Sequence, residues 1–312
     1  MAGLTALPNG LGSMGNPVTG GTYITTGSVY FVDSNTGKDS NDGKDPDHPF
    51  ATVDHAVAHC TSGKMDMIFV MPNHAETISS STEMRINVDG VKVVGLGSGE
   101  QRPTFTLDTT ASSKCEITGH SAYLENLLFK SGVDAITYGI HVGATDVTLK
   151  NIEWRDDATN NYQVSCAIAT SSSGAGGCII DGFVLNNPVD PGGTVTLKVI
   201  HMRSPRRCEI KNCYINTDTT EVIYSSSGAS TGNGQGNLIQ GNFLQKTGST
   251  SPPCITWSSD ANGSVVCDNI IFNPSSDGED PLVCDTGSFL FNNLIVNAPG
   301  ETGIDCETSG TT

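Results

Sequence analysis

One short pattern recurs along the 312-residue chain and limits the folds that are open to it. Two or three apolar residues precede a hinge of Asn or Gly, and two or three more follow it, as around Asn126, Asn151 and Asn212. The hinges stand at positions 95, 126, 151, 182, 212, 241, 269 and 293, at intervals of 24 to 31 residues. A period of about 20 to 50 residues is typical of solenoids and related arrays.

The content of each repeat narrows the fold further. The repeats hold short strand-like runs and turn residues but no useful helical segment, which excludes the helical solenoids. The hinge is too short for a hairpin, and Asn or Gly there tolerates the backbone angles of a sharp bend. We therefore expect an all-β, right-handed, single-stranded parallel β-helix of about eight or nine coils. Hinge Asn side chains that stack from coil to coil would bond to one another in an amide ladder.

The first 28 residues differ from the repeats. They are rich in Gly, Pro, Thr and Asn and lack the apolar density for a core. We expect an extended N-terminal arm at 1–28, which attaches to a particle or a partner, and one β-helix domain at 29–312. The apolar residues of the arm are the candidate partner contacts: Leu4, Leu7, Leu11, Met14 and Val18.

A short helix is predicted at about residues 50–60, where it would cap the first coil. Apolar residues recur there with helical spacing, and Thr52 stands where a helix cap is expected. The residues on the apolar face are Val53, Ala56, Val57 and Cys60.

Charge and cysteine usage exclude several classes of function. The net charge of −17 repels phosphate backbones, so we expect no nucleic-acid partner. No apolar run is long enough to span a membrane, and the first residues lack the pattern of a signal peptide. The ten cysteines include no CxxC pair and several lie in apolar runs, so we expect free core thiols, with some disulfides as the alternative.

Carboxylates at two turns are the candidates for acid–base chemistry. Asp156 and Asp157 follow one repeat beside Arg155, and a solvated turn is the favoured interpretation over a catalytic pair. A second acidic turn consists of Asp277, Glu279 and Asp280. Either turn could receive a basic side chain, Arg206 or Arg207, from a neighbouring coil. The basic run that contains them, 201–207, is expected to be an exposed turn, with a sugar-contact patch as the alternative.

Metal sites are not predicted. The loop 39–43 offers oxygen ligands, but it lacks the full pattern of a calcium loop, so we expect a turn there. His55 and His59 lie four residues apart without the Glu of a zinc-protease motif. We expect no catalytic, cofactor-binding or metal-binding residues. Four aromatic residues could stack on sugars if they were exposed, although core packing is an equal alternative: Trp154, Trp257, Tyr138 and Tyr162.

The opening of the chain resembles a known family. The segments 30–43 and 48–52, followed by 67–77, are similar to the first coil of right-handed β-helix proteins of the pectate-lyase-like superfamily. The likeness is strongest to β-helix proteins of tailed bacteriophages, which are tailspikes, fibres or trimeric capsid decorations. That resemblance implies folding in the host cytoplasm, location in the virion, a homotrimer, and a major capsid protein or another virion protein as partner.

We expect from this resemblance a non-enzymatic virion structural protein, a trimeric capsid decoration protein anchored by its arm. The repeats show no convincing catalytic constellation, and the chain has no room for the separate attachment and receptor domains of a depolymerising tailspike. The alternative is a tailspike-like glycan depolymerase, a hydrolase or lyase, or a protein that binds a host surface glycan without cleaving it.

Overall fold

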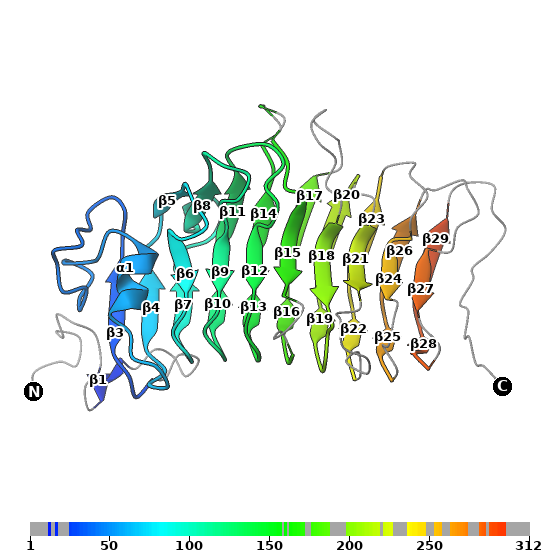
Figure 1. The fold of residues 1–312 in the computed structure, drawn as a ribbon, viewed down its shortest axis with the longest axis horizontal. Coiled ribbons are helices and arrows are strands. Elements are labelled where there is room, and N and C mark those ends of the chain that lie inside the picture. Colours follow the sequence, from blue (N-terminus) through cyan, green and yellow to red (C-terminus); the bar gives the residue numbers. More distant parts are fainter. Residues whose placement is uncertain are drawn as a thin grey trace, which may run out of the picture.

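Three parallel sheets run along the length of the molecule, and the chain visits them in the same order in every turn (Figure 1). This computed structural model describes residues 12–13, 16–17, 25–157, 159–160, 162–171, 176–187, 198–218, 221–226, 236–247, 253–257, 263–273, 281–284 and 287–297. The arm residues Leu4, Leu7, Leu11, Met14 and Val18 all lie outside the described residues, and so do Asp277, Glu279, Asp280 and Cys306.

The ten-stranded sheet takes the first strand of each turn. It consists of β3 (Val29–Val32), β4 (Met67–Val70), β7 (Lys92–Gly95), β10 (Tyr123–Glu125), β13 (Thr148–Lys150), β16 (Ile179–Asp181), β19 (Glu209–Lys211), β22 (Leu238–Gln240), β25 (Val265–Cys267) and β28 (Phe289–Phe291).

The nine-stranded sheet takes the second strand of each turn. It consists of β5 (Ala75–Ile78), β8 (Thr104–Leu107), β11 (Leu128–Ser131), β14 (Glu153–Arg155), β17 (Val184–Asn187), β20 (Tyr214–Thr217), β23 (Phe243–Lys246), β26 (Ile270–Asn273) and β29 (Leu294–Asn297).

The eight-stranded sheet completes each turn. It consists of β6 (Met84–Ile86), β9 (Cys115–Ile117), β12 (Ile140–Val142), β15 (Cys166–Thr170), β18 (Lys198–Arg203), β21 (Glu221–Ser226), β24 (Ile255–Trp257) and β27 (Leu282–Cys284). Eight successive turns, from β4 to β27, contribute one strand to each sheet. This parallel β-solenoid, which fits a right-handed β-helix, confirms the predicted fold class.

The remaining described elements are short. β1 (Gly12–Ser13) and β2 (Asn16–Pro17) form an antiparallel pair, and a 3-10 helix spans Gly99–Gln101. The helix α1 (Val53–Ala58) packs against β3, β4 and β6, which confirms the capping helix. The Thr52 hydroxyl accepts a hydrogen bond of 3.3 Å from the His55 amide, as expected of a helix cap.

The corner between the ten- and nine-stranded sheets contains the predicted hinges. From β10 to β29 it is always two residues long. The first of the two has a positive φ in each of these turns, and Asn, Asp or Gly fills it: Asn126, Asn151, Gly182, Asn212, Gly241, Asp268 and Asn292. Three predicted hinges differ: Asn269 and Asn293 are second corner residues, and Gly95 lies within β7, where a Cβ would come within 2.2 Å of the Asn126 carbonyl oxygen.

The second corner residue points inward and, in the last turns, holds the amide ladder, which includes the predicted hinges Asn269 and Asn293 but uses Asn242 instead of the predicted Gly241. Asn242, Asn269 and Asn293 form it: each side-chain nitrogen donates to a backbone carbonyl, and those of Asn242 and Asn269 also donate, at 2.9 Å, to the next Asn. Earlier turns place apolar residues at this position: Leu127, Ile152, Phe183 and Cys213. The predicted ladder is therefore confirmed only for the last turns.

Candidate functional site

A row of four polar side chains, interrupted by one buried alanine, crosses the outer face of the eight-stranded sheet, which faces the viewer in Figure 1. Parallel pairing places Glu116 of β9, His141 of β12, Ala169 of β15, His201 of β18 and Tyr224 of β21 side by side. These five residues are called the outer row. In each strand, the residues directly before and after the member of the row point toward the core, because successive side chains of a strand point to opposite faces. The row therefore gathers groups from turns that are far apart in the sequence.

Tyr138 and Arg203 lie against this row and bond to each other. One guanidinium nitrogen of Arg203 donates a hydrogen bond of 2.7 Å to the Tyr138 phenolic oxygen, and the Tyr138 ring stacks on His141 with centroids 5.3 Å apart. The backbone amide of Arg203 is fixed by the Thr170 hydroxyl at 2.7 Å. Because the phenolic oxygen accepts from Arg203, the O–H proton of Tyr138 is left to donate to a ligand.

His201 is the neutral base of the outer row. Burial, reinforced by the nearby charges of Arg203 and Lys198, lowers the pKa of His201 to about 4, so the ring is uncharged near neutral pH. Its Nε2 lies 2.9 Å from the Ser226 hydroxyl, while Nδ1 has no hydrogen-bond partner among the described residues. A neutral imidazole with one unengaged nitrogen can accept a proton from a bound substrate.

Ion pairs lie at both ends of the outer row. Lys198 lies 3.2 Å from Glu221 and also covers the Tyr224 ring at 4.5 Å. At the other end Glu116 bonds to Lys114 and, at 2.8 Å, to His141. Burial acts to raise the pKa of Glu116, but the hydrogen bonds from Lys114 and His141 outweigh it and hold that pKa below its usual range. Arg203, by contrast, has no carboxylate partner within the part of the chain that the structure describes.

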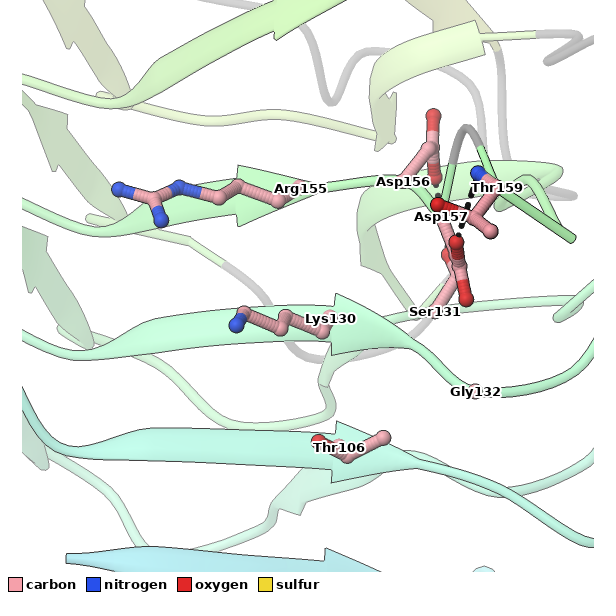
Figure 2. A pocket seen from close by; sticks show the side chains of 8 residues that line it. All are labelled: Thr106, Lys130, Ser131, Gly132, Arg155, Asp156, Asp157 and Thr159. Atoms are coloured by element: carbon pink, nitrogen blue, oxygen red, sulfur yellow. Dashed lines mark hydrogen bonds between the residues drawn. The ribbon is translucent and has the colours of Figure 1, made fainter. Parts of the chain in front are cut away.

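A pocket lies elsewhere, at the end of three strands of the nine-stranded sheet (Figure 2). Its volume is about 410 Å³. The residues that line it are Thr106, Lys130, Ser131, Gly132, Arg155, Asp156, Asp157 and Thr159. The structure thus brings together Arg155, Asp156 and Asp157, the three residues of the first predicted acidic turn.

Both carboxylates of this turn have structural partners. Asp156 accepts hydrogen bonds from the Ser131 hydroxyl and the Trp154 indole, each at 2.8 Å. Burial raises the pKa of Asp156 although these bonds oppose it, whereas bonding by Asn160 holds the pKa of Asp157 below its usual range. The prediction of a turn is confirmed, but Asp156 is half-buried in it and bonded to other side chains rather than solvated.

The other basic residues near the predicted patch do not reach this turn. Arg206 and Arg207 lie between β18 and β19, at the corner between the eight- and ten-stranded sheets. Asp156 lies at the opposite corner, where the chain leaves the nine-stranded sheet. The two arginines are exposed, as expected of a turn, and the sugar-contact alternative for this run is supported only for His201 and Arg203 at its strand end.

Two of the four aromatic candidates are core residues. The Trp154 and Trp257 side chains are 1% and 0% exposed, so neither can stack on a sugar. Trp154 continues an inner aromatic stack with Phe129, at 6.3 Å between centroids. Tyr138 is the candidate that reaches the outer row, while Tyr162 bonds through its backbone to Asp157.

The candidate metal residues have structural roles. His55 and His59 pack around the Phe50 ring at 4.8 Å each, and Asp39 accepts a hydrogen bond from the Ala51 amide in the turn. Among the residues described here, no group of three or more His, Cys, Asp or Glu side chains could hold a metal ion. No helix in the described parts is long and apolar enough to cross a membrane. Nine cysteines form no disulfide, which confirms the prediction of free thiols for the described cysteines.

Comparison with known proteins identifies similar folds. No family model matches the chain, and no curated protein does. A solved structure of a rhamnogalacturonan lyase is similar, with a TM-score of 0.48 and 12% identity over 86% of this chain and 87% of that chain. The GH136 lacto-N-biosidase from Eubacterium ramulus is also similar, with a TM-score of 0.40 and 12% identity over 86% of this chain and 68% of that one. These likenesses bear on the fold.

The expectation of a non-enzymatic, trimeric capsid decoration protein is corrected here. The two similar solved structures named above are a polysaccharide lyase and a glycoside hydrolase. The outer row, with its neutral base and its Tyr138–Arg203 pair, also supplies acid–base groups that the sequence analysis did not assemble. Phage origin, virion location, partner and trimer remain predictions.

Proposed function

We propose that this chain is a glycan-active β-helix protein that binds an acidic polysaccharide across the outer face of the eight-stranded sheet and cleaves it there. The observation that carries the proposal is the meeting of a neutral imidazole, His201, with the Tyr138–Arg203 pair on one exposed face. Acid–base cleavage of a glycan requires a proton acceptor, a proton donor and stabilisation of developing negative charge. His201 fits the role of proton acceptor, Tyr138 that of proton donor, and Arg203 that of stabilising the negative charge.

The chemistry that fits these groups best is β-elimination at a uronate residue. The Arg203 guanidinium neutralises the uronate carboxylate, which acidifies the adjacent C–H bond. Nδ1 of His201 takes that proton, and the electron pair forms a double bond as the glycosidic C–O bond breaks. The Tyr138 hydroxyl protonates the departing sugar oxygen. The products are an unsaturated uronate and a new reducing end, and proton exchange with water restores both residues.

The direct test is incubation of the pure protein with uronate-containing polysaccharides and with matched neutral ones. We expect ultraviolet absorbance from unsaturated uronate to appear only with the acidic substrates. Thr256→Ala is the matched control, because Thr256 follows Tyr224 on the same face of the sheet but lies outside the row. New reducing ends without unsaturation would replace elimination by hydrolysis, and absence of both binding and cleavage would refute the proposal.

Binding without cleavage is the second candidate function. It is favoured by the packing of the row, since Tyr138 and His201 are each in contact with a neighbouring ring and bonded to another side chain. Retention of the protein on an immobilised glycan, with no product released, would select this candidate.

We also propose a tailspike-like setting for this activity, with a host surface polysaccharide as substrate and a location on the virion. The support is the resemblance of segments 30–43, 48–52 and 67–77 to phage-encoded β-helix proteins. In this proposal residues 1–28 attach the protein to another virion protein and the assembly is a homotrimer. Mass spectrometry of purified virions tests the location: a particle without this chain would contradict it.

A further inference from the structure

The pocket on the nine-stranded sheet shares no residue with the outer row and has its own distribution of charge. Three residues that line it are neighbours in register on adjacent strands: Thr106 of β8, Lys130 of β11 and Arg155 of β14. Figure 2 shows Lys130 and Arg155 extending alongside each other, while Asp156 and Asp157 lie beyond the strand ends. The pocket therefore has a cationic side and a carboxylate side.

On the cationic side, Lys130 is the group available to a ligand. Arg155 is already bonded to Glu153 and, at 3.1 Å, to Glu100. Lys130 has no ion-pair partner among the described residues, although the chain as a whole has a net charge of −17. The charge of Lys130 acts on Asp157 across the pocket, but no carboxylate lies within ion-pair distance of it among the described residues, so its ammonium group can attract an anionic ligand group.

The opposite side of the pocket offers fixed hydrogen-bond acceptors. The amides of Thr159 and Asn160 hold Asp157 Oδ1 at 2.9 and 3.2 Å, and the Asn160 side chain holds Oδ2 at 2.7 Å. Each carboxylate oxygen has two lone pairs, so Oδ1 is fully used and Oδ2 keeps capacity for one donor from a ligand. Its pKa is held below the usual range, chiefly by the Asn160 bond, so it stays an acceptor.

These features together select among ligand classes. Free phosphate or sulfate would satisfy Lys130, but its charge is spread over all of its oxygens, so the oxygens that face Asp157 would be repelled by that carboxylate. A neutral sugar would satisfy Asp157 but leave Lys130 without a partner. A hexuronate has one carboxylate and several hydroxyl groups on one ring, and a volume of about 410 Å³ lies at the lower end of the usual range for ligand pockets.

We propose that this pocket is a second, non-catalytic carbohydrate site that binds a hexuronate residue. Lys130 pairs with the carboxylate of that sugar, and Asp157 Oδ2 accepts a hydrogen bond from one of its ring hydroxyls. Thr106 and Thr159 add hydroxyl groups along the walls. The site does not depend on cleavage at the outer row, so either proposal can fail without the other.

Binding measurements on the full chain test the site. Isothermal titration with a short oligomer of galacturonate, and with the corresponding neutral oligomer, is repeated on Lys130→Gln, Asp157→Asn and the control Lys92→Gln. Lys92 is also a half-buried lysine on an outer face, with no ion-pair partner among the described residues. The same titrations on Tyr138→Phe distinguish binding at the pocket from binding at the outer row.

We expect Lys130→Gln and Asp157→Asn each to weaken binding of the acidic oligomer at the pocket roughly tenfold or more, while Lys92→Gln and Tyr138→Phe leave that component unchanged. A crystal of the wild-type protein soaked with galacturonate should show density beside Lys130, which covers the case of a variant that misfolds. Binding of phosphate as tight as that of galacturonate, equal weakening by Lys92→Gln, or density only at the outer row would overturn the assignment.

Discussion

Arg203 reaches the phenolic oxygen of Tyr138 across two turns of the β-helix, at 2.7 Å. The two residues are 65 positions apart in the sequence, and the contact exists because parallel pairing brings β12, β15 and β18 side by side. The pair joins a hydrogen-bond donor to a cation on a face that also carries a neutral imidazole. The first predictions follow from this arrangement.

Tyr138→Phe should lower the turnover of an acidic polysaccharide roughly 10²-fold, because it removes the proton donor for the departing oxygen and keeps the ring that stacks on His141. Product absorbance gives the rate, and thermal unfolding gives the control. The melting temperature should change little, since the side chain lies on the outer face. A variant as active as the wild-type protein would remove Tyr138 from the mechanism.

The ionisation of His201 should set the acid side of the pH–rate profile. The folded pKa of about 4 means that the base is free above that pH and is lost as the pH falls through it. Arg203→Gln should raise this pKa, because a nearby positive charge that opposes protonation is removed. Two-dimensional NMR of the imidazole signals measures the shift. An unchanged or lower pKa in the variant would contradict this interpretation.

The same imidazole should make folding stability depend on pH. The pKa of His201 in the folded protein lies below its ordinary value of 6.5, so between pH 6.5 and 4 the unfolded chain binds a proton that the folded chain does not. Stability should therefore fall as the pH drops through this window. Urea denaturation at several pH values measures the effect, and it should be smaller in His201→Gln, which has no titrating ring.

Asn269→Ala should destabilise the protein by about 3 kcal/mol, because each buried partner left unsatisfied costs about 1–3 kcal/mol. The substitution removes the acceptor of the Asn242 backbone amide and the donor to the Ile239 carbonyl. Chemical denaturation measures the loss. Asn216→Ala is the comparison, since among the described residues the Asn216 side chain bonds to Asn186 alone, and it should cost under about 1 kcal/mol.

The buried thiols should react only when the protein unfolds. Burial raises the pKa of Cys166, Cys213 and Cys254 to about 12 each, so few thiolates form near neutral pH. Alkylation followed by mass spectrometry should label the half-buried Cys60 and Cys284 first, and the buried cysteines only in denaturant. Protection of a described cysteine by a disulfide would contradict the structure.

The fold was predictable because its signals are local to each turn. The hinge pattern predicted the repeating coil of the β-helix, and the helical spacing of apolar residues after Thr52 predicted the capping helix. The amide ladder was located in part: the predicted hinges Asn269 and Asn293 belong to it, but Gly241 has a positive φ, and the buried amide in that turn belongs to the next residue, Asn242. A shift by one position matters here, because in a strand-like segment the next side chain points to the opposite face.

The outer row was not predictable in the same way. His201, Arg203 and Tyr138 were visible as separate residues, but their proximity depends on the register between turns. The connections from the nine- to the eight-stranded sheet vary in length, as between Arg155 and Cys166 and between Thr217 and Glu221. A sequence does not show which residues of such connections are paired, so side chains two turns apart cannot be aligned from spacing alone.

The two-residue corner after the ten-stranded sheet has a consequence for how such a chain can change. From β10 to β29 this corner keeps its length while the other two corners differ from turn to turn. An inserted residue there would reverse the inward and outward faces of the strand that follows. Insertions at the other corners leave every strand in register. New loops can therefore be inserted, by evolution or by design, at those two corners alone. The constant corner keeps the strands of successive turns aligned.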